Sequence, residues 1–291
     1  MSSSYADDNS AYCLFPFTFQ YETLAHSIPA CFNNIKVWMN NHYLKLNSDK
    51  TEIVLFGHPK QSRNIVIHRT FLDPTTCIRF SDSVKHLGVW LDKSLQFNLH
   101  ISKIVSICFA NLCNIRSIRK FLTKKSTETL VHSMITCHLD RCNSLFFGIS
   151  CANLKKLQSI QNSAIRIIFK LKKRDSLKSY LDILHWLNVE QRIYFKVILI
   201  IFKTIHNLAP PLLCNLITIK NSSQMTLETK FFFSSSKAGD RAFIFYAPRL
   251  CNSLPLALRT VHNVNQFKID LKTFLFSSFE YYKNKTKILC L

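Results

Sequence analysis

The chain has 291 residues, with 38 lysines and arginines against 17 aspartates and glutamates, so its formal net charge is +21. A surplus of this size favours a polyanionic partner, either nucleic acid or an acidic membrane surface. Hydrophobic residues make up 47% of the chain, which excludes a disordered basic tail. The four glycines form neither a dinucleotide-binding fingerprint nor a P-loop.

Cysteine usage and the N-terminus predict an intracellular protein of the nucleus or cytoplasm that is not secreted. The eleven cysteines include no C-x-x-C pair, which indicates reduced thiols. The closest spacings, Cys108/Cys113 and Cys137/Cys142, each have four residues between them, and zinc ligand pairs usually have two to four with a second matching pair. His138 beside Cys137 leaves a metal site as an alternative, but buried thiols on helices are the better explanation, so we expect no structural zinc. The first residues lack a signal-peptide pattern.

The first ninety residues are predicted to contain one amphipathic helix and short strands. The apolar positions of the helix recur at spacings of four, three, four and three, in Leu24, Ile28, Cys31, Ile35 and Trp38. A strand is predicted at Ile53–Phe56, before Gly57. A second strand pair is predicted at 77–80 and 84–91, with residues 81–83 as the turn.

From about residue 94 the pattern becomes helical. Its apolar positions follow a helical period in Ile101, Ile104, Val105, Cys108, Leu112 and Ile115. Three further helices are expected at 126–147, 151–171 and 175–207. The last contains the longest apolar run, Ile193–Phe202, which is too short for a membrane span and indicates a core helix that Pro210 and Pro211 stop.

The remainder of the chain divides into two parts. Residues 212–240 are expected to form a loop-rich connection, because they show no sustained period. Residues 241–282 are rich in phenylalanine and leucine and are expected to pack back on the helices.

Two adjacent carboxylates occur in the tetrapeptide Tyr5-Ala-Asp-Asp8. Hard oxygen ligands at a tight turn are what a magnesium site for nucleotidyl transfer requires, because the ion stabilises the attacking and leaving oxygens. A solvated turn near a polar terminus contains the same residue types, so the tetrapeptide alone leaves both interpretations open.

The order of several motifs resembles the reverse transcriptases of non-LTR (LINE-type, jockey-like) retrotransposons. Tyr5-Ala-Asp-Asp8 is followed by the amphipathic helix, then by Leu44–Glu52 and by Val84–Asp92. Later segments resemble the thumb region and the C-terminal tail of that family: Val131–Met134, Leu139–Gly148, Leu157–Arg166, Leu184–Lys196, Gly239–Phe243, Ala247–Pro255 and Phe267–Phe276.

The resemblance implies an α+β, predominantly helical fold, in which a partial polymerase palm is followed by a helical thumb. The palm would cover residues 1–92, the thumb 93–207, and a C-terminal extension packing on the thumb 208–291. The family consists of RNA-directed DNA polymerases, which use Mg²⁺ and deoxynucleoside triphosphates (dNTPs) to extend a DNA primer on an RNA template. The resemblance implies no membrane partner.

Five residues match functional positions of the family. Asp7 and Asp8 fall on its metal-binding pair, with Asp7 the more direct ligand. Lys50 falls beside the incoming triphosphate, where it would neutralise developing charge or donate a proton to pyrophosphate; an exposed turn lysine is the alternative. Leu87 and Gly88 fall on the turn of the primer grip, where glycine permits close backbone approach, although any strand-end glycine would match.

Other positions depart from the family pattern. The resemblance begins at the catalytic hairpin, so the fingers, the nucleotide pocket and the first palm strand with its further aspartate have no counterpart. Met1–Ser4 is too short and polar to be expected to pair as a buried strand. Cys251 stands where the family commonly has tryptophan, and Asn9-Ser10 also departs. We therefore expect a C-terminal fragment without polymerase activity alone. The alternatives are a non-catalytic nucleic-acid-binding module and a decayed relic.

Two basic clusters contain no acidic residue. The candidates for nucleic-acid contact are Arg116, Arg119, Lys120, Lys124, Lys125, Arg166, Lys170, Lys172, Lys173 and Arg174. Clusters at helix ends suit sequence-independent contacts with the phosphates of a primer–template duplex. The alternative is a solvated charged face, because cations are favourable at helix C-termini.

Overall fold

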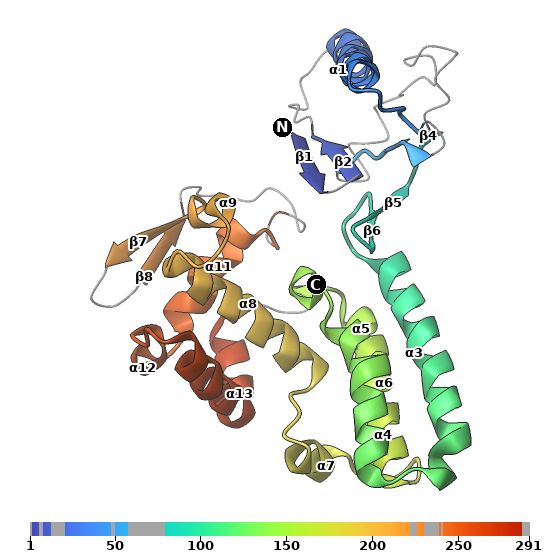
Figure 1. The fold of residues 1–291 in the computed structure, drawn as a ribbon. Helices are drawn as coiled ribbons and strands as arrows, with labels where there is room; N and C mark the ends of the chain where they lie inside the picture. The colour runs from blue at the N-terminus through green and yellow to red at the C-terminus, as the bar shows by residue number, and fades with distance from the viewer. Residues whose placement is uncertain are drawn as a thin grey trace. The chain divides into compact units, whose positions relative to one another are not determined.

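The computed structural model describes residues 2–5, 8–12, 21–47, 50–57, 79–221, 226–229, 239 and 241–286 (Figure 1). The chain divides into two compact units, Met1–Leu95 and Gln96–Leu291, which we call unit 1 and unit 2. Helices dominate and the strands are short, so the fold is α+β and predominantly helical.

The described residues of unit 1 form one long helix and three two-stranded sheets. The elements are β1 Ser2–Tyr5, β2 Asp8–Ala11, α1 Tyr21–Asn41, β3 Glu52–Ile53, β4 Arg79–Phe80, β5 Ser83–His86 and β6 Val89–Asp92. β1–β2 and β5–β6 are antiparallel hairpins, whereas β3 and β4 pair in parallel.

Helix α1 confirms the amphipathic helix, but its apolar stripe is only partly covered. Ile35 is half-buried, whereas Cys31 is exposed and Trp38 is 55% exposed. Trp38 stacks instead on His42, with 4.2 Å between the ring centroids. Within the described part of the helix, the stripe is therefore not a closed core face.

The predicted strand pairing was wrong in unit 1. β4 pairs with β3, which is limited to Glu52–Ile53, and the hairpin lies inside residues 83–92. The turn is formed by Leu87 and Gly88, whose φ values are 46° and 85°. Two consecutive left-handed residues match the twist of a tight hairpin, so they form a better turn than residues 81–83.

Unit 2 contains the larger helical core. Its elements are α3 Asn98–Ile118, η3 Arg119–Phe121, α4 Lys124–Val131, the π-helical turn η4 His132–Thr136, α5 Cys137–Asp140, η5 Asn143–Phe146, α6 Cys151–Phe169, α7 Lys178–Ile183, α8 Val189–Ile205, α9 Pro211–Cys214, β7 Ile217–Asn221, β8 Thr226–Thr229, α11 Phe243–Ser253, α12 Leu256–Arg259 and α13 Val264–Thr286. β7 and β8 form an antiparallel hairpin.

Several predicted helix bounds need correction. The helix expected at 126–147 ends at Asp140, and Cys142 takes the left-handed conformation. The helix expected at 175–207 is two helices, because Asn188 begins α8 with a capping box: its side chain accepts a hydrogen bond from the Gln191 N–H. The connection expected to be loop-rich contains α9 and the β7–β8 hairpin.

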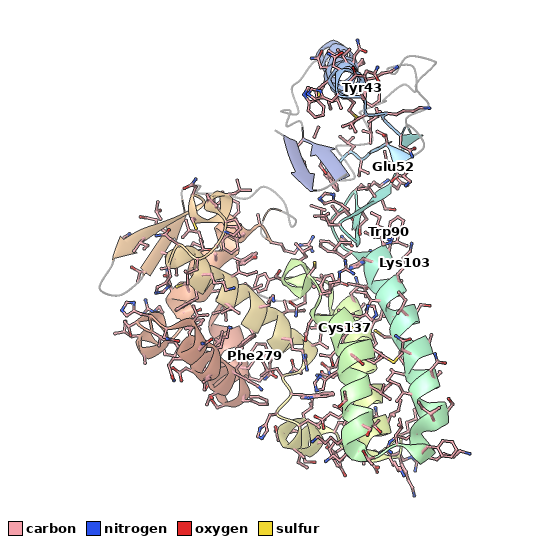
Figure 2. The ribbon with its side chains drawn as sticks, viewed as in Figure 1. Tyr43, Glu52, Trp90, Lys103, Cys137 and Phe279 are labelled. Atoms are coloured by element: carbon pink, nitrogen blue, oxygen red, sulfur yellow. The ribbon has the colours of Figure 1, made fainter. Side chains whose placement is uncertain are left out.

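Helix α8 is the centre of unit 2, as the apolar run predicted. Ile193, Val197, Ile201 and Phe202 are each at most 3% exposed. The C-terminal helix α13 packs on it, which confirms that the segment 241–282 folds back on the helices. Phe279 of α13 meets Tyr194 edge-on at 5.1 Å (Figure 2).

Helix α3 packs on α6 through the face that the period predicted, with Ile101, Ile104, Cys108, Leu112 and Ile115 buried. By length and composition, Asn98–Phe121 is the one stretch among the described helices that could cross a membrane. Its outer face is largely exposed, and its inner face is part of the core of unit 2.

The cysteines are less buried than predicted. Burial raises the pKa of Cys108 to about 12, but Cys113, Cys137 and Cys142 are exposed. Cys113 lies on the opposite face of α3 because five residues turn a helix by about 140° relative to Cys108. Of these four cysteines, Cys108 alone is buried as predicted.

Candidate nucleic-acid interface

Helices α3 and α6 both end at the same end of the helical part of unit 2 (Figure 1). A basic pocket is lined by residues from these two helix ends. Its volume is about 840 Å³ and its lining residues are Arg116, Arg119, Lys120, Ser163, Arg166, Ile167, Lys170, Leu171 and Lys173. None of these described lining residues is acidic. Six of the ten predicted contact residues are thus brought together from two sequence clusters about 50 residues apart.

The two helix C-termini explain part of this charge. The last carbonyls of a helix carry a partial negative charge that attracts cations. The site is therefore favourable for lysines and arginines even without a ligand. The six cations differ in how many of their hydrogen-bond donors are paired inside the protein.

The guanidinium of Arg119 is hydrogen-bonded within the protein. Its guanidinium donates to the carbonyls of Ile167, Ile168 and Leu122 at 2.9, 2.8 and 2.7 Å. The first two carbonyls belong to the last turn of α6, so Arg119 connects η3 to the end of that helix. This residue supports the pocket wall and uses three of the five N–H donors of its guanidinium within the protein.

The guanidinium of Arg166, in contrast, is mostly unpaired within the described part of the chain. Its Nη2 donates one long hydrogen bond to the Lys173 carbonyl, at 3.3 Å. Its Nε is buried and has no hydrogen-bond partner among the described residues. A guanidinium has five N–H donors, so most of the capacity of Arg166 is unused within the described part of the chain.

Lys170 occupies a position that normally favours glycine. It caps the C-terminus of α6 with φ 56° and ψ 40°, and its N–H donates to the Arg166 carbonyl. A residue with a Cβ is strained in this left-handed conformation, where glycine is the usual choice. The lysine side chain is exposed and lines the pocket.

The Lys170→Gly variant is expected to raise the free energy of unfolding by roughly 0.5–1 kcal/mol, because glycine removes the left-handed strain. Denaturant unfolding of the full chain measures the change. Lys172→Gly is the matched control, since Lys172 is also an exposed lysine but has no positive φ. Equal effects of the two substitutions would contradict the assignment of strain to residue 170.

The other four predicted cations do not line the pocket. Lys124 lies over the Phe169 ring with its Nζ 4.1 Å from the centroid, much as the lining residue Lys120 lies over Phe121 at 4.8 Å. The remaining three, which do not line the pocket, are exposed: Lys125, Lys172 and Arg174. Sequence reasoning missed Ser163, although its place three residues before Arg166 puts both on one helix face.

The predicted catalytic residues belong to unit 1. Asp7 lies outside the described residues, and Asp8 begins β2, paired with Tyr5. Ser2–Tyr5 pairs with β2 as a strand despite its short polar sequence. Lys50 is exposed, and its N–H donates to Asn47 Oδ1 at 3.2 Å.

The predicted primer-grip turn lies at the tip of the β5–β6 hairpin, and Leu87 is 42% exposed there. Within the described ranges, no three His, Cys, Asp or Glu side chains gather as metal ligands. The geometry on which a function can be built is therefore that of the basic pocket in unit 2.

Comparisons with protein-family models, with curated proteins and with solved structures found no match for this chain. The charge, donors and shape of the basic pocket are consequently the features from which a function can be inferred.

Proposed function

We propose that the chain acts as a part of an RNA-directed DNA polymerase of the non-LTR type, in which unit 2 binds the sugar–phosphate backbone of the primer–template duplex. The observation that supports this role is the pocket with six cations and no acidic residue in its described lining. In this proposal residues 1–92 correspond to the palm and residues 93–207 to the thumb. The protein would work in the nucleus or cytoplasm.

The proposed binding is independent of base sequence. Cations that contact phosphates release condensed counterions, and the gain in free energy falls as the salt concentration rises. The pocket has the residue types for this task and lacks the side-chain amides that read adenine edges in a groove. It would hold the duplex in register for a catalytic centre, without contributing to the chemical step.

Salt dependence tests the proposal directly. The full chain is expected to bind a 20-base-pair RNA–DNA hybrid with a slope of log affinity against log salt of roughly −4 to −5, which corresponds to about five phosphates. Replacing Arg116, Lys120 and Lys173 by glutamine should reduce the slope by roughly 3. Fluorescence anisotropy at several salt concentrations measures both values.

The matched control replaces three exposed lysines elsewhere in unit 2, Lys155, Lys156 and Lys272, by glutamine. This variant has the same net charge as the pocket variant, and its slope should stay close to that of the unmodified chain. A flat salt response, or equal losses in the two triple variants, would contradict the proposed role of the pocket.

Asp7 and Asp8 are proposed as the Mg²⁺ ligands of the complete enzyme, whose substrates would be dNTPs. When bound, the metal would supply the charge stabilisation that nucleotidyl transfer needs. The described residues contain no group of three or more His, Cys, Asp or Glu side chains that would complete such a site. Replacing both aspartates by asparagine should leave hybrid binding unchanged, since the pocket belongs to unit 2.

A further inference from the structure

We propose that the basic pocket contains a defined seat for a single backbone phosphate, centred on Arg166. This inference rests on the proposed function and makes it more specific. A general positive field attracts any polyanion, whereas a seat positions one phosphodiester group by directed hydrogen bonds. The seat comprises Arg166, Lys170 and Ser163 on α6, with Lys173 from the segment that follows.

Arg166 has hydrogen-bond donors that the fold leaves unused. Its Nε is buried without a partner among the described residues, and the one hydrogen bond of its Nη2 is 3.3 Å long. A buried cationic donor without an acceptor is costly, so native structures pair such groups with protein, water or ligand. The buried Nε has almost no accessible surface, so a phosphate would bind to the Nη1 and Nη2 N–H groups, of which one is used at 3.3 Å. A guanidinium can bind two phosphate oxygens at once.

Helix geometry holds the donors of the seat in place. Ser163, Arg166 and Ile167 line the pocket at spacings of three and four residues, so they form one stripe along α6. Lys170 follows directly as the C-cap of that helix. On the other side, Arg116 belongs to the last turn of α3, and Arg119 and Lys120 belong to η3. The ends of two packed helices therefore hold Ser163, Arg166 and Arg116 at the pocket.

Lys170 adds a cation to the seat. It has φ 56°, and its side chain lines the pocket four residues beyond Arg166. Eight described non-glycine residues of this chain have a positive φ, so the contribution of Lys170 to the seat is its charge and not its backbone conformation. Glycine at this position would remove that charge.

Arg119 differs from Arg166 in its hydrogen bonds. It lines the same pocket, but it donates to three backbone carbonyls and so has fewer free donors for a phosphate than Arg166. Arg116 is exposed and also lines the pocket, and it contributes charge from the α3 side. Of the three arginines, Arg166 combines a fixed position with free donors.

The charge-preserving variant Arg166→Lys tests the seat in the full chain, with Arg116→Lys as its matched control. The probe is the 20-base-pair RNA–DNA hybrid at constant salt, and folding is monitored by thermal unfolding. A seat predicts that Arg166→Lys lowers affinity about tenfold, because a lysine cannot replace two directed guanidinium hydrogen bonds. Arg116→Lys should change affinity by less than about twofold.

The outcomes separate the two proposals. Equal affinities of the two lysine variants would overturn the seat, while a retained salt slope would leave the proposed duplex binding intact. No binding of the hybrid by the unmodified chain would overturn both. Tighter binding to anionic phospholipid vesicles than to the hybrid would assign the pocket to a lipid headgroup and would also overturn the seat.

If Arg166→Lys lowers the melting temperature, its loss of affinity could come from unfolding, so a second variant tests the seat. Lys170→Gly is expected to keep or improve folding, so its effect on binding cannot come from unfolding. The seat predicts a loss of affinity of at least about fivefold for Lys170→Gly, against less than about twofold for Lys125→Gly, an exposed lysine outside the pocket. Equal small losses in both would overturn the proposal.

Discussion

Replacing Arg119 by methionine is expected to lower the free energy of unfolding by about 3 kcal/mol. The guanidinium donates to the carbonyls of Ile167, Ile168 and Leu122, and methionine would leave all three without this donor. The two α6 carbonyls belong to the last turn of the helix, which has no further helical residues to satisfy them. Denaturant unfolding followed by circular dichroism measures the loss.

Arg116→Met is the matched control for this prediction. Arg116 is exposed on the last turn of α3 and lines the same pocket, and its removal should change stability by less than about 0.5 kcal/mol. Comparable losses for the two arginines would contradict a supporting role for Arg119. In binding experiments Arg116→Met should reduce the salt slope, whereas Arg119→Met should mainly reduce the folded fraction.

These two arginines show the limit of the sequence analysis at the candidate site. Both are predicted as phosphate contacts because they belong to a basic cluster with no acidic residue. The difference between them depends on the end of α6, about 50 residues further along the chain, whose carbonyls approach one guanidinium and not the other. A local pattern cannot contain this information, since it arises from how α3 and α6 pack.

The fold was predictable where one physical rule acted alone. The buried stripe of α3 and the apolar run of α8 follow from the helical period, and both were confirmed. The predictions were wrong where two rules competed. For the hairpin, residues 81–83 have turn-forming composition, but the left-handed conformations of Leu87 and Gly88 match the hairpin twist better. For the helix expected at 175–207, the apolar pattern is continuous, but the capping box at Asn188 begins a new helix.

Several motifs that the resemblance singled out prove to be points of contact between segments. Gln161 donates to the Leu187 carbonyl at 2.8 Å, which joins α6 to the loop before α8. Asn252 accepts from the Leu227 N–H at 2.8 Å and donates to its carbonyl at 2.9 Å, so its amide acts as a short strand partner for β8. These hydrogen bonds give the polar residues of the two motifs a structural role.

Gly148 also lies where two segments of the chain meet. Its φ of 70° favours glycine, and a Cβ built there would lie 2.8 Å from the Cγ and Cδ atoms of Arg241. The Arg241 side chain thus packs directly on the glycine backbone, which connects the C-terminal segment to the loop before α6. The motif around residue 148 requires glycine because no other residue would permit both the backbone conformation and this close approach.

Arg192→Met is expected to lower the free energy of unfolding by about 2 kcal/mol, because it removes contacts between α5 and α8. Arg192 Nη1 lies 2.8 Å from Asp140 Oδ2, and its Nε donates to the Leu187 carbonyl at 3.0 Å. The Arg192 side chain is 14% exposed, whereas Asp140 is 44% exposed and the Leu187 carbonyl keeps its hydrogen bond from Gln161. Chemical denaturation of the full chain measures the change.

A double-mutant cycle with Asp140→Asn separates the ion pair from the rest of this loss. The Asp140 side chain is 44% exposed, so solvent screens the pair, and the coupling energy should be about 1 kcal/mol. The rest of the loss in Arg192→Met would then come from one of the two hydrogen bonds to the Leu187 carbonyl and from packing on Trp186, whose ring centre is 5.8 Å from the guanidinium. A coupling energy as large as the whole loss would show that the ion pair alone joins the two segments.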